Sequence, residues 1–256
     1  MNVVLALEFP PISHLINWPD IAGEGPFAIN KIALIYFTAT LLTVVFFYLG
    51  TRKRALVSSG VQTIAESSVD FVRNQIIMQT IGPDGMRYLP LLATMFFFIF
   101  FSNIFEIIPL VQMPANARMA MPMVLALLVW VIFNVVGVVK QGPIHYLKNS
   151  LIPPGVPIFL LPLVAIIELV STFLVRPFSL AVRLFANMLA GHLILVTFAI
   201  ITAELFQPKL TIIIWPFSFL LLTGLTAFEL LVAFLQAFIF TILAAVYIGG
   251  AMHPEH

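Results

Sequence analysis

Cysteine is absent from this chain of 256 residues, and charged side chains make up only 9 % of it. The absence of cysteine excludes disulfides, iron–sulfur clusters and metal sites built on thiolates. Soluble globular proteins carry about 25 % charged residues. Because 61 % of the residues are hydrophobic, the chain holds more apolar surface than a soluble protein of this length can bury. We therefore predict a polytopic membrane protein.

Several sequence signals are also missing. No glycine is followed by lysine, so a phosphate loop of the GxxxxGK[ST] type is excluded, and we expect no bound nucleotide. We expect no cofactor and no nucleic-acid partner either. We also expect no metal, because the histidines near the C-terminus are too weak a pattern to indicate a metal site. The first 25 residues lack the basic start, apolar core and cleavage site of a signal peptide. Insertion is therefore expected to depend on the first span.

Apolar runs of about 20 residues, the length that crosses a bilayer as a helix, divide the chain. We predict one all-α integral membrane domain with about five transmembrane helices and one amphipathic helix on the cytoplasmic surface. After an external N-terminal segment, 1–30, the predicted membrane helices are 32–49, 89–108, 123–139, 158–202 and 210–251. Segment 55–82 is the amphipathic helix, because its apolar side chains recur every three or four residues.

The last two apolar segments are unusually long. Each has more than about 40 residues, or about 60 Å of helix, which is roughly twice the hydrocarbon thickness. Each fits either two short spans with a tight turn or one long, tilted helix. Polar turn residues accompany none of their prolines except near Glu204. We therefore predict two tilted helices that form a hairpin.

Basic residues indicate the orientation of the chain. Cytoplasmic loops of membrane proteins carry an excess of lysine and arginine. Five crossings place three basic residues outside: Lys31, Arg118 and Lys209. They place seven inside: Arg52, Lys53, Arg54, Arg73, Arg87, Lys140 and Lys148. The N-terminus is therefore predicted outside and the C-terminus in the cytoplasm.

Ionisable side chains inside membrane helices are costly and indicate function by default. The long segments contain Glu168, Arg176, Arg183, His192 and Glu229, with Asn187 and Gln236 as polar neighbours. Asn103 and Glu106 lie near the outer end of the second span. Helical spacing places these groups along and around two helices instead of in one compact cluster. That distribution is more typical of proton conduction than of catalysis.

Two kinds of chemistry are present among these residues. His192 titrates near neutrality, and burial raises the pKa of a carboxylate such as Glu229, so both suit proton transfer. Arg183 stays charged and cannot relay protons. A fixed cation can instead attract an ionised carboxylate on a moving partner and stop protons from passing directly.

Structural interpretations remain open for the same residues. Arg176 can reach water or bind backbone carbonyls near Pro177, and Glu168 can form a salt bridge with it. His192 can be a core histidine, Arg183 can be structural, and the two amides can join helices by hydrogen bonds. Two other functions are also open: a secondary transporter with an arginine for an anionic substrate, and a membrane scaffold. The absence of an internal repeat is evidence against the transporter.

Residues 177–192 read PFSLAVRLFANMLAGH, which resembles the signature of F-type ATP synthase subunit a. That signature is an Arg-Leu-Phe-x-Asn core followed by a pair of small residues. Ser102-Asn103 with Ile108-Pro109 resembles the end of another helix of the family. Glu229 and Gln236, seven residues apart, are similar to its two polar positions in the last helix. The order of elements agrees over nearly the whole chain.

The resemblance implies a stator subunit of the F0 proton channel that is not catalytic by itself. In the family, a tilted helical hairpin lies against a rotating ring of c subunits, each with an essential carboxylate. Two offset half-channels lead protons to and from that ring, so that their flow drives rotation and ATP synthesis. The implied partners are the c-ring, b-type stator subunits, membrane lipid and, indirectly, the F1 sector. The implied location is the bacterial plasma membrane, with the proton as the transported ion.

The resemblance also implies a role for each residue. Arg183 matches the essential arginine, and Asn187 and Gln236 match its neighbours at the interface with the ring. His192 and Glu229 match a pair in the outer half-channel, in which some members of the family exchange the acid and the histidine. The remaining candidates for the proton path are Glu168 in the inner half-channel, and Glu106 and Asn103 on the outer side.

Overall fold

The structure is a computed structural model that describes residues 20–23, 29–52, 60–108, 111–152, 157–207 and 210–252. Several predictions fall outside these residues. They concern most of the N-terminal segment, the start of the amphipathic segment, and the basic residues Lys53, Arg54 and Lys209. The histidines at the C-terminus, His253 and His256, also lie outside the described residues.

Five helical segments within the described residues are long and apolar enough to cross a membrane. This finding confirms the predicted all-α integral membrane fold. The segments are α2 (Lys31–Arg52), Pro83–Ile104, α6 (Ala120–Gln141), Ile158–Leu205 and α10 (Trp215–Met252). The second segment consists of η2 (Pro83–Tyr88) and α5 (Leu89–Ile104). The fourth consists of η4 (Ile158–Leu160), α8 (Leu161–Val170), η5 (Ser171–Val175) and α9 (Arg176–Leu205).

Shorter elements connect these helices. Before α2, the strands β1 (Asp20–Ala22) and β2 (Ile29–Asn30) pair in antiparallel orientation. The remaining elements are α3 (Val61–Phe71), η1 (Val72–Ile77), α4 (Met78–Thr80), η3 (Ala115–Ala117), α7 (Pro143–Leu151) and η6 (Leu210–Ile213).

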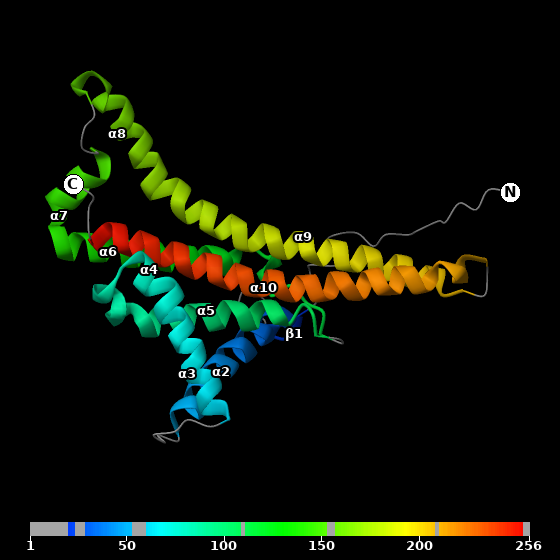
Figure 1. The fold of residues 1–256 in the computed structure, drawn as a ribbon. Coiled ribbons are helices and arrows are strands. Elements are labelled where there is room, and N and C mark those ends of the chain that lie inside the picture. The colour runs from blue at the N-terminus through cyan, green and yellow to red at the C-terminus, as the bar shows by residue number, and fades with distance from the viewer. Residues whose placement is uncertain are drawn as a thin grey trace.

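Helix α10 lies at the centre of the bundle, where it packs against α5, α6 and α9 (Figure 1). Its buried face carries the small residues Ala237, Ala244 and Ala245. Small residues allow helices in a membrane to approach closely. Helix α5 instead contributes large rings, including Phe96 and Phe97, to the same core. Bulky and small faces therefore fill the space between these helices.

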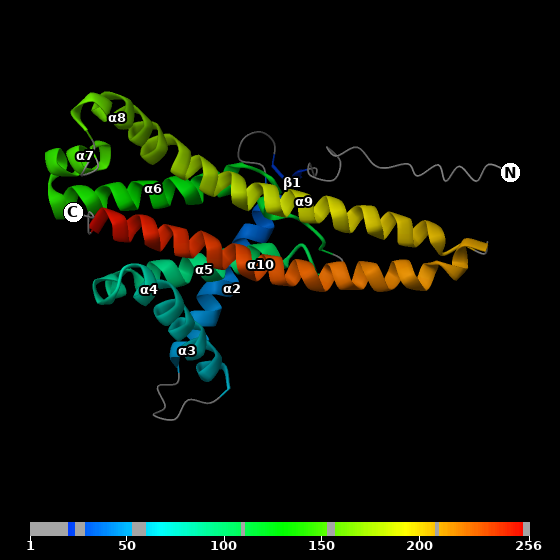
Figure 2. The same cartoon turned by 45° about the horizontal axis from the view of Figure 1, so that its top comes forward.

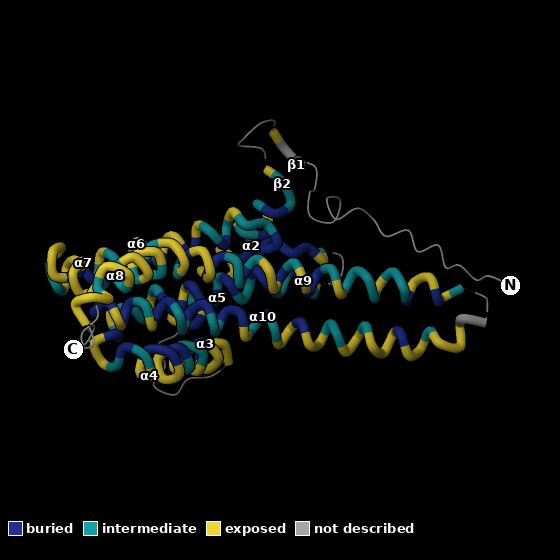
Figure 3. The backbone as a smooth tube through the Cα atoms, turned by 90° about the horizontal axis from the view of Figure 1, so that it is seen from above, coloured by how far each residue is buried: buried dark blue, intermediate teal, exposed yellow. Residues whose placement is uncertain are grey.

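Helices α9 and α10 run side by side as a long hairpin that extends beyond the other helices (Figures 1 and 3). Helix α8 precedes α9 and extends it at its N-terminal end, but α8 leans away from α10 (Figures 1 and 2). The π-helical turn η5 lies between α8 and α9 and ends two residues before Pro177. Proline has no N–H to donate to the carbonyl four residues earlier, here that of Phe173 in η5. The change of direction therefore has a local cause in the sequence.

Helix α5 ends at Ile104, whereas the predicted segment extended to 108. Turns of four residues follow, in which Glu106 N–H donates to the Asn103 carbonyl at 3.1 Å and Ile107 N–H donates to that of Ile104 at 2.9 Å. Pro109 comes soon after, and a residue before proline disfavours helix. Apolar composition alone does not reveal this early end, which turns Glu106 into the bundle.

The segment predicted as amphipathic consists of α3, η1 and α4. Its charged residues Asp70 and Arg73 are exposed, as the helical spacing predicts. Val72 and Ile76 are fully buried in the main core, because η1 packs against α5 and α10. Ile64, by contrast, is 60 % exposed. In the first half, α2 covers Ala65, whereas the apolar side chain of Ile64 is left exposed.

Thr202 of α9 and Ser218 of α10 form a hydrogen bond near the tip of the hairpin, with 2.7 Å between their hydroxyl oxygens. Both side chains are buried. The contact fixes the register of the two helices far from the rest of the bundle.

Replacing both residues by cysteine is expected to produce a disulfide on mild oxidation. The hydroxyl oxygens lie 2.7 Å apart. Two sulfur atoms in their places would need only a small shift to reach the S–S bond length of about 2.05 Å. The chain has no other cysteine, so the measurement is the intact mass, or mobility on a non-reducing gel, of Thr202→Cys/Ser218→Cys.

The matched control is Thr202→Cys/Thr223→Cys. Thr223 is exposed and lies five residues further along α10, or about 140° around the helix. Equal cross-linking in both double variants would contradict the register described for the hairpin.

Candidate functional site

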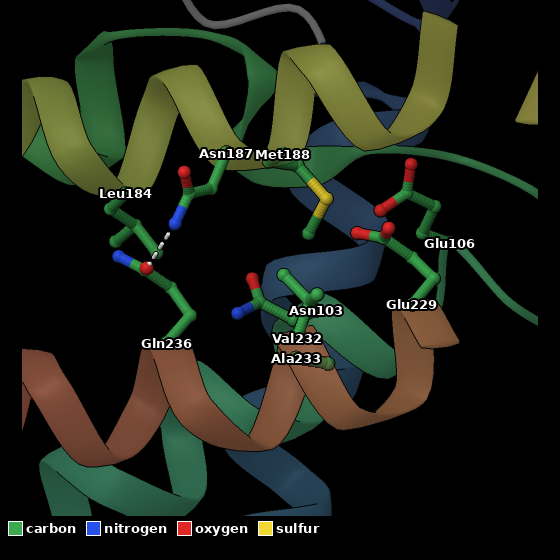
Figure 4. A pocket seen from close by; sticks show the side chains of 9 residues that line it. All are labelled: Asn103, Glu106, Leu184, Asn187, Met188, Glu229, Val232, Ala233 and Gln236. Atoms are coloured by element: carbon green, nitrogen blue, oxygen red, sulfur yellow. Dashed lines mark hydrogen bonds between the residues drawn. The ribbon is translucent and has the colours of Figure 1, made fainter. Parts of the chain in front are cut away.

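Polar side chains from α5, α9 and α10 meet at one small pocket inside the membrane domain (Figure 4). Its lining residues are Asn103, Glu106, Leu184, Asn187, Met188, Glu229, Val232, Ala233 and Gln236. Five of these nine residues were predicted from the sequence as part of a proton path. The predicted groups are thus more compact here than a path strung along two helices.

Glu106 and His192 form a buried pair beside this pocket. The distance between Glu106 Oε1 and His192 Nδ1 is 3.6 Å, and the two side chains are 1 % and 7 % exposed. The turn after α5 places Glu106 there, and α9 supplies His192. An acid and an imidazole are thus close neighbours in the interior of the bundle.

Glu229 of α10 is also buried, and its carboxylate lies beside Gly191 of α9. A Cβ atom at Gly191 would overlap the carboxylate of Glu229. Any larger residue at position 191 would therefore require the Glu229 side chain to move from its present place. Gly191 belongs to the small-residue pair of the sequence motif, but no role was predicted for it. A motif in α9 does not reveal which residue of α10 lies opposite.

Asn187 and Gln236 join α9 to α10 on another side of the pocket. Asn187 Nδ2 donates to Gln236 Oε1 at 2.7 Å. Gln236 is buried, and its Nε2 has no hydrogen-bond partner among the described residues. This hydrogen bond agrees with the expectation that the two amides can join helices, and it also leaves one amide nitrogen beside the pocket.

Arg183 lies on α9 one turn before Asn187 and does not line the pocket. Its side chain is half-buried. Within the described part of the chain it makes no ion pair and no side-chain hydrogen bond. A cation in a membrane helix without such a partner is costly, so its position requires an anion or water from outside the chain.

Arg176 and Glu168 are not paired with each other among the described residues. The guanidinium of Arg176 instead lies over the ring of Tyr247 in α10, 5.5 Å from its centre. This cation–π contact was not among the expected interactions of Arg176. Glu168 lies on α8, beyond the η5 turn and away from the pocket.

The proton path predicted from the sequence did not include three polar residues near the pocket: Tyr36, Ser102 and Asn116. Asn116 of η3 forms hydrogen bonds with Ser102 and Asn103, and Tyr36 of α2 forms one with Asn116. Asn116 lies in a connecting segment outside the apolar runs, where polar residues are ordinary, so no sequence signal distinguishes it.

The chemistry available at this site is proton transfer. Two carboxylates and an imidazole are buried together, with amides that can orient water or bind the ionised forms. Among the residues with described positions, no three acidic or histidine side chains are grouped so that they could hold a metal ion.

Comparison with known proteins gives consistent results. The model of the ATP synthase A chain family matches residues 33–249. A protein of Frankia alni described as ATP synthase subunit a is 44 % identical over 94 % of this chain and 84 % of its own length. Proteins with the same description from Rhodococcus erythropolis and Rhodopseudomonas palustris are 43 % and 40 % identical. They cover 97 % and 96 % of this chain, and 89 % and 96 % of their own lengths.

Proposed function

The chain belongs to the ATP synthase A chain family, with a role in the F0 sector of ATP synthase, and from that premise we propose how it works. It is the stator part of the proton channel and provides two offset half-channels. Together with Arg183, these couple proton flow across the bacterial plasma membrane to rotation of a ring of c subunits.

The observation that carries this proposal is the lack of a partner for Arg183. Its side chain is half-buried and makes no ion pair within the described residues. A cation within a membrane helix is costly unless an anion or water lies beside it. An ionised carboxylate on a passing c subunit fits this requirement, because it can arrive, be stabilised by the arginine and leave again once it is protonated.

The positions of the acidic groups along the helix support two separate half-channels. His192 follows Arg183 by nine residues, or about 13 Å of helix, and lies with Glu106 and Glu229. Glu168 precedes Arg183 by 15 residues, or roughly 22 Å. The outer cluster and the inner acid therefore lie on opposite sides of the arginine along the helix, so a proton that moved directly between them along α9 would have to pass a fixed cation.

Basic residues near the C-terminal end of α10 support the proposed orientation of the chain in the membrane. Near the C-terminal end of α10, the Arg87 guanidinium contacts the sulfur of Met252, and the Gln141 side chain donates to the Ala251 carbonyl. Arg87 and Lys140, the neighbour of Gln141, are thus close to this end. Basic residues mark the cytoplasmic side, so the C-terminus is assigned to the cytoplasm and the N-terminus to the outside.

Replacing Arg183 by alanine is expected to abolish ATP-driven proton pumping while the complex still assembles. The variant loses the cation that favours the ionised form of the ring carboxylate. The measurement is quenching of a pH-sensitive dye in inverted membrane vesicles, with the amount of assembled complex determined on a native gel.

Arg176→Ala is the matched control, since it removes the same charge from the same helix. It removes the contact with Tyr247 but no ion pair within the described part of the chain, so pumping per assembled complex is expected to stay within about twofold of the wild type. Near-normal pumping by Arg183→Ala would refute the proposed mechanism.

Gly191→Ala is expected to lower pumping per assembled complex by at least about tenfold, because misplacing a reacting group by 1 Å can cost about 100-fold. The added methyl group would displace the Glu229 carboxylate. In the control Gly224→Ala, also in a membrane helix, the new Cβ would meet no atom within 4 Å. Equal pumping by the two variants would show that the position of this carboxylate is unimportant.

A further inference from the structure

A buried chain of hydrogen bonds reaches the pocket from the segment between α5 and α6. Asn116 has no exposed surface. Its Nδ2 donates to Asn103 Oδ1 at 2.6 Å and to Ser102 Oγ at 3.0 Å. Its Oδ1 accepts a hydrogen bond from the Tyr36 hydroxyl of α2 at 2.9 Å. The single proton of that hydroxyl is shared with the Ala115 carbonyl at 2.8 Å, so the Asn116 amide is held mainly through the two hydrogen bonds of its nitrogen.

These contacts determine which end of the Asn103 amide is left for the pocket. The oxygen of an amide accepts hydrogen bonds and its nitrogen donates them, and a half-turn of the group exchanges the two. Because Asn116 holds Oδ1 of Asn103, the nitrogen of Asn103 remains as a donor. Asn103 lines the pocket together with Glu106 and Glu229 (Figure 4).

The orientation of Asn103 has a chemical consequence. A donor beside the pocket stabilises an ionised carboxylate, whereas a carbonyl oxygen in the same place would repel it. The cycle of proton uptake and release requires each acid in the pocket to be ionised for part of the time. The direction of the Asn103 amide therefore affects how readily the pocket passes a proton.

We propose that Asn116 is a positioning residue, which holds the oxygen of the Asn103 amide and so leaves the Asn103 nitrogen as the donor at the pocket that Glu106 and Glu229 also line. This inference rests on the proposed function, since it assigns Asn116 a role in proton transfer. Asn116 does not itself line the pocket and acts only through Asn103.

A purely structural role for Asn116 gives a different expectation. Asn116 also connects η3 to Tyr36 of α2, so its loss could simply weaken the packing of the outer loop. In that case the effect of removing Asn116 would not depend on Asn103. If Asn116 acts through Asn103, removing it after Asn103 is gone should have no further effect.

The experiment is a double-mutant cycle with Asn116→Leu, Asn103→Ala and the combined variant. Leucine is similar in size to asparagine but cannot donate a hydrogen bond. Pumping is measured in inverted vesicles and divided by the amount of assembled complex. We expect each single variant to pump at least about tenfold more slowly, as for the loss of a hydrogen bond to a charged group, and the double variant to match Asn103→Ala within about twofold.

The matched control is Asn134→Leu. Asn134 of α6 also accepts a hydrogen bond from a tyrosine hydroxyl, that of Tyr146 at 3.0 Å, and its nitrogen donates to the Trp130 carbonyl at 2.7 Å. It does not line the pocket. The same chemical change there is expected to leave pumping per assembled complex within about twofold of the wild type.

Three results would overturn the inference. The first is wild-type pumping by assembled Asn116→Leu. The second is a double variant in which the two losses multiply. The third is failure of both Asn116→Leu and the smaller change Asn116→Ala to assemble while Asn134→Leu assembles, which would assign Asn116 to folding. If only the leucine variant fails, the alanine variant replaces it in the cycle.

A parallel measurement of Glu229→Gln separates this inference from the proposed function. Normal pumping by Glu229→Gln would refute the role of the pocket itself. Loss of pumping in Glu229→Gln together with normal pumping in Asn116→Leu would leave the proposed function intact and refute only the role of Asn116.

Discussion

The contact between α9 and α10 is the interaction on which the site depends. Three pairs mark it: Asn187 with Gln236, Gly191 with Glu229, and Thr202 with Ser218. Going from the first pair to the second, the position advances by four residues in α9 and goes back by seven in α10; from the second pair to the third it advances by 11 and goes back by 11. The order of the pairs is that of antiparallel helices in fixed register. A change of one residue in this register would move Glu229 away from its space beside Gly191 and separate the two amides. The hairpin therefore positions the functional groups as well as crossing the membrane.

The membrane explains why these pairs are polar. Helices in lipid gain little from burying apolar surface against each other, so close packing and hydrogen bonds between helices contribute a larger share of their association. Small residues of α10 supply the close packing against α5, and the amide and hydroxyl pairs supply the hydrogen bonds to α9. The polar groups that the proposed proton path requires thus also help to hold the hairpin together, which is consistent with their burial.

Hydropathy predicted the five membrane segments because a bilayer imposes both their length and their composition. The residues of the site were identified because charged groups within such segments are rare. What the sequence could not show are contacts between segments distant in the chain. The pairing of Glu106 with His192 depends on the early end of α5, and the place of Glu229 depends on a glycine in another helix. Asn116 escaped notice because it lies in a connecting segment, where asparagine is common.

The two arginines of α9 lie in different environments, and the difference fits the proposed role of Arg183. Arg176 lies against the ring of Tyr247, so its charge is partly satisfied without a carboxylate. Glu168 makes no ion pair among the described residues. Arg183 has no comparable aromatic or acidic neighbour within the described chain. A strong internal partner would compete with any carboxylate arriving on a rotating subunit, so the lack of one is what the proposed role of Arg183 requires.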